Sequence, residues 1–505
     1  MIALKSEEMR FVEEKTMEQL GIPGIILMEH AALAVSNEVL KKTEDNTKVY
    51  VFCGTGNNGG DGFAIARQLI QQNITTKIFI IGDSTSIKGD AKTNYNILVN
   101  SGAEVICIKE EKDILLLFNK IDRDSIIVDS ILGIGCNKPL KGLIKLVAEK
   151  INASGAYVVS TDIPTGINCD TGQIMEASVK ADKTVCFGFP KIGLFLYPAK
   201  EYVGELIIAD ISIPQSVWRN INFKHEIIDK SYIELLPDRD KIGHKGSFGK
   251  VLIFAGSKTM AGAAALSALA AYKAGCGVVK IITERGNEGS IFSLVPEAII
   301  LTYEKNESLE PTLYENEILW ADAVLAGPGM GNDAYTKTII EYLLSFNNKN
   351  IVIDADGLNC IANNLELLKA SKSNIIITPH IGEMSKLTNK SVEDISENKL
   401  AIAKQFSMDY YVTCVLKSET TVVASEENIF INSLGNNGMA TAGSGDVLAG
   451  IICSLFSYTN KALKASVLGV FIHSFAGDYI RSIIGEEAIT ARNIIEGISA
   501  LHKRK

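Results

Sequence analysis

The stretch Gly54-Thr55-Gly56-Asn57-Asn58-Gly59-Gly60-Asp61-Gly62 follows an apolar run, Val49 to Cys53, and precedes a helical pattern that we expect to begin around Phe63. An apolar strand, a glycine-rich turn and a helix are typical of an α/β domain with a parallel sheet. The glycines permit positive φ and a close approach of a ligand to the backbone. The turn therefore predicts an anion site at a helix N-terminus, although a short GxGxxG match also occurs in turns with only a structural role.

The same alternation of apolar runs and helical patterns continues to about residue 213, after an amphipathic helix over Ile26 to Lys41. It predicts parallel strands with helices on both faces of the sheet. The expected strands are Val49 to Cys53, Lys77 to Ile81, Glu104 to Ile108, Ile126 to Asp129, Tyr157 to Thr161, Thr184 to Phe187 and Leu206 to Ile211.

The rhythm is lost between Asn222 and Asp240, where a polar, proline-containing stretch is typical of a linker. We place the boundary near residue 235 and predict two domains, residues 1–222 and 235–505. Alternation then restarts, followed by a β-hairpin and, from Ala442 onward, three helices. The strands expected in this half are Val251 to Ala255, Val278 to Thr283, Ala298 to Thr302, Ala323 to Ala326, Ile351 to Asp354, Ile375 to Thr378 and Val412 to Leu416, with Thr421 to Ala424 and Ile429 to Ile431 as the hairpin.

The composition is that of a folded globular protein. Hydrophobic residues make up 47% of the 505 residues and charged residues 22%. The net charge of −9 argues against a nonspecific nucleic-acid binder, which needs clustered Lys and Arg. The nine cysteines form no CxxC pair, and no apolar run reaches the roughly 20 residues of a membrane span. We expect a cytoplasmic protein with no membrane partner.

Two further motifs end strands of the first half. They are Val128-Asp129-Ser130-Ile131-Leu132-Gly133-Ile134-Gly135 and Thr161-Asp162-Ile163-Pro164-Thr165-Gly166. A single Asp at a strand end is more often a helix cap or turn former than a catalyst. The carboxyl ends of parallel strands meet at one sheet edge, so three such polar ends together favour a ligand site.

In this order, the three motifs resemble those of the NAD(P)H-hydrate epimerase domain, a Rossmann-like three-layer α/β/α family, over roughly residues 1–220. The resemblance implies a potassium ion held by Asn58, Asp129 and Thr165, the last standing where many members have Ser. Potassium prefers such oxygen ligands. The resemblance also implies a set of residues that contact the substrate: Asn57, Asn58, Gly59, Gly60, Asp61, Gly133, Ile134, Gly135, Cys136, Asn137, Lys138, Pro139 and Asp162.

Epimerisation at C6 of the hydrated ring through ring opening requires an acid and a base near the carbinol. By motif position Asp162 and Asp129 are the nearest carboxylates. We name Asp162 as the catalytic candidate and leave open which of the two transfers the proton.

In the second half, the segment Asn436 to Asp446 is the most informative. Its glycine-rich turn places Asp446 directly before an apolar helix, Val447 to Phe456, where backbone donors can stabilise charge on a phosphoryl group. Asp446 could there accept a proton from an attacking hydroxyl, or merely cap the helix. Further motifs on successive strand ends favour a ligand: GSFGK (246–250), AGS (255–257), GPGMG (327–331), DADGLN (354–359), TPHIGE (378–383) and Lys417 to Thr421.

Together these motifs resemble the ADP/ATP-dependent NAD(P)H-hydrate dehydratase, a member of the ribokinase-like superfamily, over about residues 235–503. The resemblance implies that Asp446 is the base in phosphorylation of the C6 hydroxyl, with Mg²⁺ on the nucleotide phosphates and ADP as the likelier donor. It implies hydrate binding by Ala263, Gly329, Gly331, His380 and Asp446. Nucleotide binding falls to Lys417, Ser418, Glu419, Thr420, Thr421, Asn436, Asn437, Gly438, Met439, Ala440, Thr441, Ala442, Gly443, Ser444 and Gly445, with Ser418 standing where many members have Gly.

Two other functions compete with a bifunctional repair enzyme. One is a ribokinase-like small-molecule kinase with a regulatory N-terminal domain, against which TPHIGE and the first three motifs argue. The other is a non-catalytic nucleotide sensor or scaffold, against which the retained Asp162 and Asp446 argue. We expect a homo-oligomer whose partners are small molecules: the hydrated cofactors NADHX and NADPHX (hydrated NADH and NADPH), and ADP or ATP.

Overall fold

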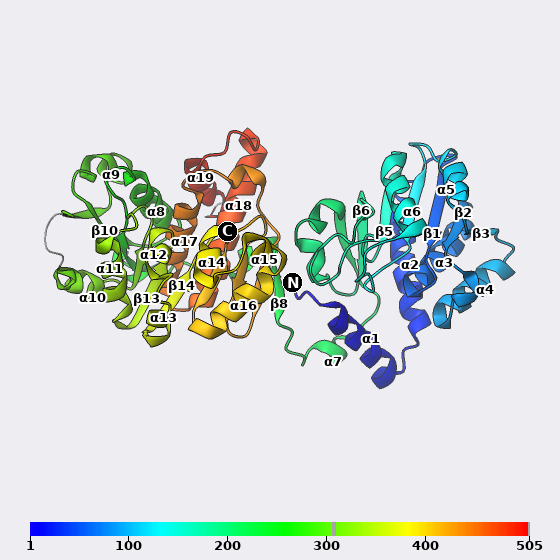
Figure 1. Ribbon diagram of the computed structural model, residues 1–505, viewed down its shortest axis with the longest axis horizontal. Coiled ribbons are helices and arrows are strands. Elements are labelled where there is room, and N and C mark those ends of the chain that lie inside the picture. Colours follow the sequence, from blue (N-terminus) through cyan, green and yellow to red (C-terminus); the bar gives the residue numbers. More distant parts are fainter. Residues whose placement is uncertain (306–309, 503–505) are drawn as a thin grey trace. The chain divides into compact units, whose positions relative to one another are not determined.

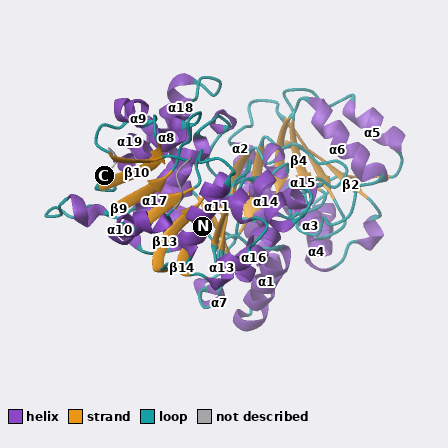
Figure 2. Cartoon of the chain, turned by 60° about the vertical axis from the view of Figure 1, so that its left-hand side comes forward, coloured by secondary structure: helices purple, strands orange, loops and turns teal. Residues whose placement is uncertain are grey.

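The computed structural model describes residues 1–305 and 310–502. The chain forms two compact units, Met1–His225 and Glu226–Lys505. In each unit the strands lie between helices (Figures 1 and 2). The predicted α/β class is therefore confirmed for both halves.

The N-terminal unit contains one seven-stranded sheet of order β3-β2-β1-β4-β5-β6-β7, and every neighbouring pair is parallel. The strand order reverses between β1 and β4, which is where open α/β sheets bind ligands. The strands are β1 (Lys48–Cys53), β2 (Thr75–Ile81), β3 (Val105–Ile108), β4 (Ile126–Ser130), β5 (Tyr157–Thr161), β6 (Lys183–Phe187) and β7 (Glu205–Ala209). The helices are α1 (Ser6–Leu20), α2 (Gly24–Leu40), α3 (Asn57–Gln71), α4 (Gly89–Asn100), α5 (Glu111–Phe118), α6 (Gly142–Ser154) and α7 (Gln215–Trp218).

Both faces of this sheet are buried. Val49 and Val51 of β1 belong to a core cluster shared with α1 to α4, while Tyr50 and Phe52 belong to a second cluster shared with α5 and α6. Successive side chains of a strand point to opposite faces, so a sheet covered on both sides needs apolar residues at every position. This explains why β1 is a continuous apolar run in the sequence.

The C-terminal unit contains a ten-stranded sheet of order β11-β10-β9-β12-β13-β14-β15-β16-β17-β8. It is parallel from β11 to β15 and antiparallel through the predicted hairpin β16–β17. The strands are β8 (His225–Ile228), β9 (Lys250–Phe254), β10 (Val278–Glu284), β11 (Ile299–Tyr303), β12 (Ala323–Ala326), β13 (Asn347–Ile353), β14 (Lys372–Ile377), β15 (Thr413–Leu416), β16 (Val422–Ala424) and β17 (Ile429–Asn432). The helices are α8 (Ala261–Lys273), α9 (Glu288–Leu294), α10 (Glu315–Trp320), α11 (Ala334–Leu344), α12 (Asp356–Ile361), α13 (Glu366–Ala370), α14 (Ile381–Thr388), α15 (Val392–Glu397), α16 (Lys399–Tyr410), α17 (Ser444–Thr459), α18 (Ala462–Ile484) and α19 (Ala491–His502).

Two sequence expectations were wrong. The segment interpreted as a linker contains β8, which is the edge strand next to β17. The helix expected near Phe63 begins at Asn57, so the polar loop is its first turn. Among the described residues, α18 is long and apolar enough to cross a membrane, but 67% of its apolar window is buried in the protein, as in a core helix.

Candidate active sites

The glycine-rich loop after β1 is tightly packed. A Cβ atom on Gly54 would lie 2.0 Å from the carbonyl oxygen of Ile131, and one on Gly59 would lie 2.0 Å from the carbonyl oxygen of Gly54. None of the five glycines has a positive φ, contrary to part of the sequence argument. Glycine is needed at positions 54 and 59 because a side chain there would collide with backbone atoms, whereas a Cβ on Gly56 would meet nothing within 4 Å.

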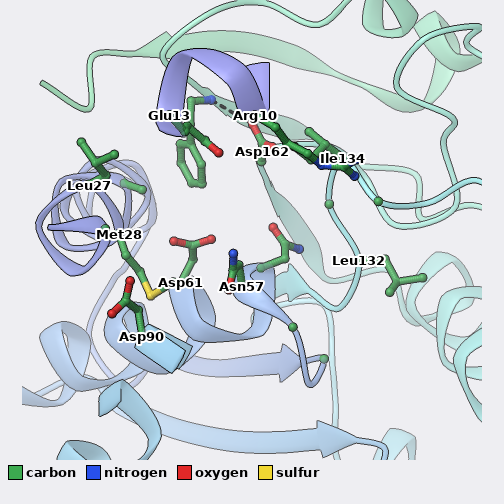
Figure 3. A pocket seen from close by; sticks show the side chains of 18 of the residues that line it. Arg10, Glu13, Leu27, Met28, Asn57, Asp61, Asp90, Leu132, Ile134 and Asp162 are labelled. Atoms are coloured by element: carbon green, nitrogen blue, oxygen red, sulfur yellow. Dashed lines mark hydrogen bonds between the residues drawn. The ribbon is translucent and has the colours of Figure 1, made fainter. Parts of the chain in front are cut away.

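A cavity of about 600 Å³ opens over this turn (Figure 3). Part of the cavity lining consists of residues predicted to contact the substrate, namely Asn57, Asn58, Asp61, Gly133, Ile134, Gly135 and Asp162. The other predicted positions lie elsewhere: Gly59, Gly60 and Cys136 are buried, and Asn137, Lys138 and Pro139 are exposed without lining the cavity. The structure thus gathers about half of the predicted set around one cavity.

The predicted ion ligands Asp129 and Thr165 lie together. The Thr165 hydroxyl donates to Asp129 Oδ1 at 2.6 Å and its backbone N–H donates to Oδ2 at 2.8 Å, while the Ser160 hydroxyl donates at 3.0 Å. Burial raises the pKa of Asp129 and these hydrogen bonds oppose the rise. The amide nitrogen of Asn58 is buried without a hydrogen-bond partner among the described residues.

Asp162 is held rigidly at the end of β5. Its backbone has a φ of +63°, and its Oδ1 accepts from the Phe187 N–H at 3.0 Å and from the Lys191 ammonium at 2.5 Å. Lys191 is fully buried. Burial acts to lower the pKa of its ammonium, but the Asp162 carboxylate outweighs this effect and raises it.

Two further carboxyl groups face the same cavity, Glu13 on α1 and Asp61 on α3 (Figure 3). Burial raises the pKa of Asp61 well above its ordinary value, and the Asp162 carboxylate adds to the effect. Burial likewise raises the pKa of Glu13, to about 7. The cavity therefore holds two acidic groups for which the neutral form is favoured by their surroundings.

In the C-terminal unit, Asp446 lies in the first turn of α17. The turn before this helix reaches it through Gly443, whose φ of +87° is a conformation that favours glycine. Burial raises the pKa of Asp446 to about 7, the Asp354 carboxylate adds to the rise, and the Lys417 ammonium opposes it. A carboxyl group with this pKa can exchange protons near neutral pH.

Lys417 follows β15 and points at the same helix terminus. Its ammonium lies 2.7 Å from Asp354 Oδ1, and a Cβ on Gly445 would lie 3.4 Å from its Nζ. Burial acts to lower the pKa of this ammonium, but the Asp354 carboxylate outweighs the effect and raises it. A fixed positive charge beside exposed helix N–H groups forms a site for a phosphate.

Some of the predicted hydrate-binding residues lie next to one another or to Lys417. His380 caps α14, its Nδ1 accepting from the Glu383 N–H at 3.2 Å, and it forms an isolated parallel bridge with Lys417. A Cβ on Gly329 would lie 2.9 Å from Cβ of Ala263. The strand ends thus bring together His380 with Lys417, and Gly329 with Ala263.

The predicted nucleotide segments have structural anchors. Between β15 and β16, Glu419 forms an ion pair with Lys399, and the Ser418 hydroxyl donates to the carbonyl of Thr420 at 2.7 Å. Before α17, the Asn436 amide donates to Asp478 Oδ1 at 2.9 Å. In this second segment, Asn437 to Met439 form a 3-10 turn, and Ala440 to Ser444 follow it. Thr421 is the last residue of the first segment.

Sequence reasoning assigned no role to several residues that the structure brings into the two sites. Arg10 and Glu13 belong to a helix with no glycine motif, and Lys191 lies beyond the third motif. Asp354 was visible in the DADGLN motif, but its ion pair with Lys417 joins strands that are 63 residues apart. Across residues 1–305 and 310–502 there is no group of three or more His, Cys, Asp or Glu side chains that could hold a metal.

The two folds define a chain with a Rossmann-like domain followed by a ribokinase-like domain, and the N-terminal cavity lies at the carboxyl edge of its sheet. Residues 24–193 match a family model described as YjeF-related protein N-terminus, and residues 251–499 match one described as NAD(P)H-hydrate dehydratase.

Full-length relatives make the assignment specific. The bifunctional NAD(P)H-hydrate repair enzyme Nnr of Moorella thermoacetica is 33% identical over 98% of this chain and 96% of its own length. Its namesake in Thermofilum pendens is 34% identical over 97% of this chain and 94% of its own. A solved ribokinase-like superfamily protein from Enterococcus faecalis, 26% identical, covers 56% of this chain and 98% of its own with a TM-score of 0.50. The chain belongs to the family of bifunctional NAD(P)H-hydrate repair enzymes.

Proposed function

We propose that the N-terminal domain interconverts the R and S epimers of hydrated NADH and NADPH, and that the C-terminal domain dehydrates the S epimer at the expense of ADP or ATP. The observation that carries this proposal is the end-to-end similarity to repair enzymes of this name. The cavity at the sheet edge of the N-terminal domain and the buried Asp446 of the C-terminal domain support it. A kinase with a regulatory N-terminal domain would not require the polar cavity found over α3.

In the dehydratase site, Asp446 accepts the proton of the C6 hydroxyl as this oxygen attacks the terminal phosphorus of the nucleotide. The N–H groups at the start of α17 and the Lys417 ammonium stabilise the negative charge of the transferred phosphoryl group. The C6 phosphate is a better leaving group than hydroxide. The ring nitrogen expels it to give an iminium, and loss of the C5 proton to solvent then restores the dihydropyridine. Mg²⁺ would neutralise the nucleotide phosphates, as phosphoryl transfer generally requires.

In the epimerase site, Asn58, Asp129 and Thr165 would hold a potassium ion. The residue types fit, because they offer carboxylate, hydroxyl and carboxamide oxygens, the hard ligands that potassium prefers, and the Asp129 carboxylate and Thr165 hydroxyl are already in contact. A bound cation would supply positive charge beside the cavity. Asp129 is enclosed by its hydrogen-bond donors, which suits an ion ligand better than a group that must exchange protons with substrate.

The cellular setting is proposed on the same basis. All nine cysteines are free thiols and seven of them are buried, which supports a reducing, cytoplasmic location. A homo-oligomeric assembly acting on small molecules alone, without nucleic acid or membrane, remains our expectation for this chain.

A nucleotide series tests the dehydratase proposal. Purified S epimer is incubated with the protein and Mg²⁺ in the presence of ADP, ATP or no nucleotide, and NADH is followed by its absorbance. We expect recovery with ADP or ATP, with one phosphate released per NADH, and none without nucleotide. Recovery that does not depend on nucleotide would contradict the proposal.

A further inference from the structure

The helix α1 forms one wall of the epimerase cavity. Arg10, Glu13, Glu14 and Met17 line it, at the spacing i, i+3, i+4, i+7 that places side chains on one helix face. This helix lies outside residues 24–193, the part matched by the N-terminal family model. Figure 3 shows Glu13 projecting from α1 into the cavity, across from Asp61.

The helix is fixed in place at its N-terminus. The Leu4 N–H donates to the carbonyl of Pro190 at 2.9 Å, and the Ser6 hydroxyl donates to Asp170 Oδ2 at 2.9 Å. Met9 and Val12, which do not line the cavity, are fully buried. The carboxyl group of Glu13 is therefore held at the cavity by a packed helix, which is the preorganisation that a proton-transfer group needs.

Two other carboxylates at this sheet edge, Asp129 and Asp162, are occupied by hydrogen-bond donors. Asp129 accepts hydrogen bonds from the Thr165 hydroxyl and N–H and from Ser160, and Asp162 accepts from Phe187 and Lys191. No hydrogen bond to the Glu13 carboxyl group is found within the described part of the chain. The Glu13 carboxyl group is thus available to a ligand in the cavity.

We propose that Glu13 is the catalytic acid–base residue of the epimerase site; the inference rests on the proposed epimerase function. In the hydrated ring, C6 bears the hydroxyl and the bond to N1. Glu13 removes the hydroxyl proton, the C6–O bond becomes a carbonyl as the C6–N1 bond breaks, and N1 keeps the electron pair and receives the proton from Glu13. Rotation of the aldehyde and the reverse steps close the ring on the other face, so protons and electrons balance without a further reagent.

The charges around Glu13 suit this task. It faces Arg10 and Glu14 on its own helix, Asp162 and Lys191 at the sheet edge and Asp61 on α3. Burial raises its pKa to about 7, and Asp162 adds to the rise while Lys191 opposes it. At neutral pH the carboxylate and the acid are both populated, so one group can take and return the proton.

The test is epimer exchange by the full-length protein without nucleotide, starting from purified S epimer and separating R from S at pH values on both sides of 7. We expect the wild-type rate to fall as the pH drops below 7. The Glu13→Gln variant should lose about 100-fold or more in kcat, with KM changed by no more than about threefold. Its exchange rate should no longer fall as the pH drops below 7. Glu13→Asp should retain part of the exchange rate and should still slow down at low pH.

Two controls separate chemistry from folding. Glu18→Gln changes an exposed carboxylate on the same helix and should exchange at the wild-type rate. Glu13→Gln should still dehydrate S epimer with ADP. Exchange by Glu13→Gln at about the wild-type rate would overturn the inference. So would a fall in exchange rate at low pH that disappears in Asp61→Asn but persists in Glu13→Gln. A wild-type protein that exchanges no faster than buffer would instead overturn the proposed epimerase function.

Discussion

At the scale of single residues, the two sites share one physical device, a carboxyl group placed where its charge is costly. Asp446 sits in the first turn of α17 and Glu13 on the cavity wall, and burial raises the pKa of each to about 7. A solvated carboxylate is too weak a base for an alcohol, whereas a group with a pKa near the working pH serves both as base and as acid. Lys417 and Lys191 keep the neighbouring carboxylates Asp354 and Asp162 paired.

The change Asp446→Ala should abolish dehydration and leave epimer exchange intact, because the two sites lie in separate domains. We expect a loss of about 10³-fold or more in kcat, the contribution of a positioned base. In the wild-type protein, kcat/KM should fall below pH 7, where Asp446 becomes protonated and can no longer accept the hydroxyl proton. An unchanged dehydration rate in the variant would remove Asp446 from this role.

The change Asp129→Ala should stop epimer exchange and spare the conversion of S epimer. It deletes the carboxylate that Thr165 and Ser160 surround and that we propose as the ion ligand. Exchange rates are compared in potassium and in sodium buffers for the variant and the wild type. If the variant still exchanges the epimers, and its exchange rate is the same in potassium and in sodium, the ion site is misplaced.

At the scale of elements, the sequence predicted what hydrophobic periodicity encodes. Runs such as Val49 to Cys53 are apolar at every position because both sheet faces are covered, so they are visible without tertiary information. The four residues of β8 are too few for a pattern, and their pairing with β17 joins segments about 200 residues apart. The role of α1 was hidden for a different reason: its cavity face is polar, which in a sequence is indistinguishable from a solvated face.

The position of β8 predicts that the domain boundary lies earlier than residue 235. A fragment of residues 224–505 should have a higher thermal midpoint than one of residues 235–505. The shorter fragment lacks buried Ile228 and Tyr232, the latter 6.2 Å from the ring of Phe471, and exposes the edge of β17. The lost burial corresponds to about 3 kcal/mol or more. Equal midpoints in calorimetry would contradict this role of β8.

At the scale of the whole molecule, each of the two α/β domains has its candidate site at the sheet edge where strand order reverses. In the N-terminal sheet the reversal lies between β1 and β4, and in the C-terminal sheet between β9 and β12. Motifs that end strands could be expected to lie close together from the sequence, since topology brings parallel strand ends to one edge. Side chains that reach a site from outside these ends, such as Arg10 and Glu13, required the structure.

The central claim is that one chain repairs both epimers. The direct measurement is recovery of NADH absorbance from a mixture of R and S hydrates, with Mg²⁺, K⁺ and ADP, by the wild-type protein and by Asp129→Ala. We predict complete recovery by the wild type in a single rapid phase, and by the variant a rapid phase limited to the S fraction. Recovery limited to the S fraction in both proteins, or absent from both epimers, would contradict the account.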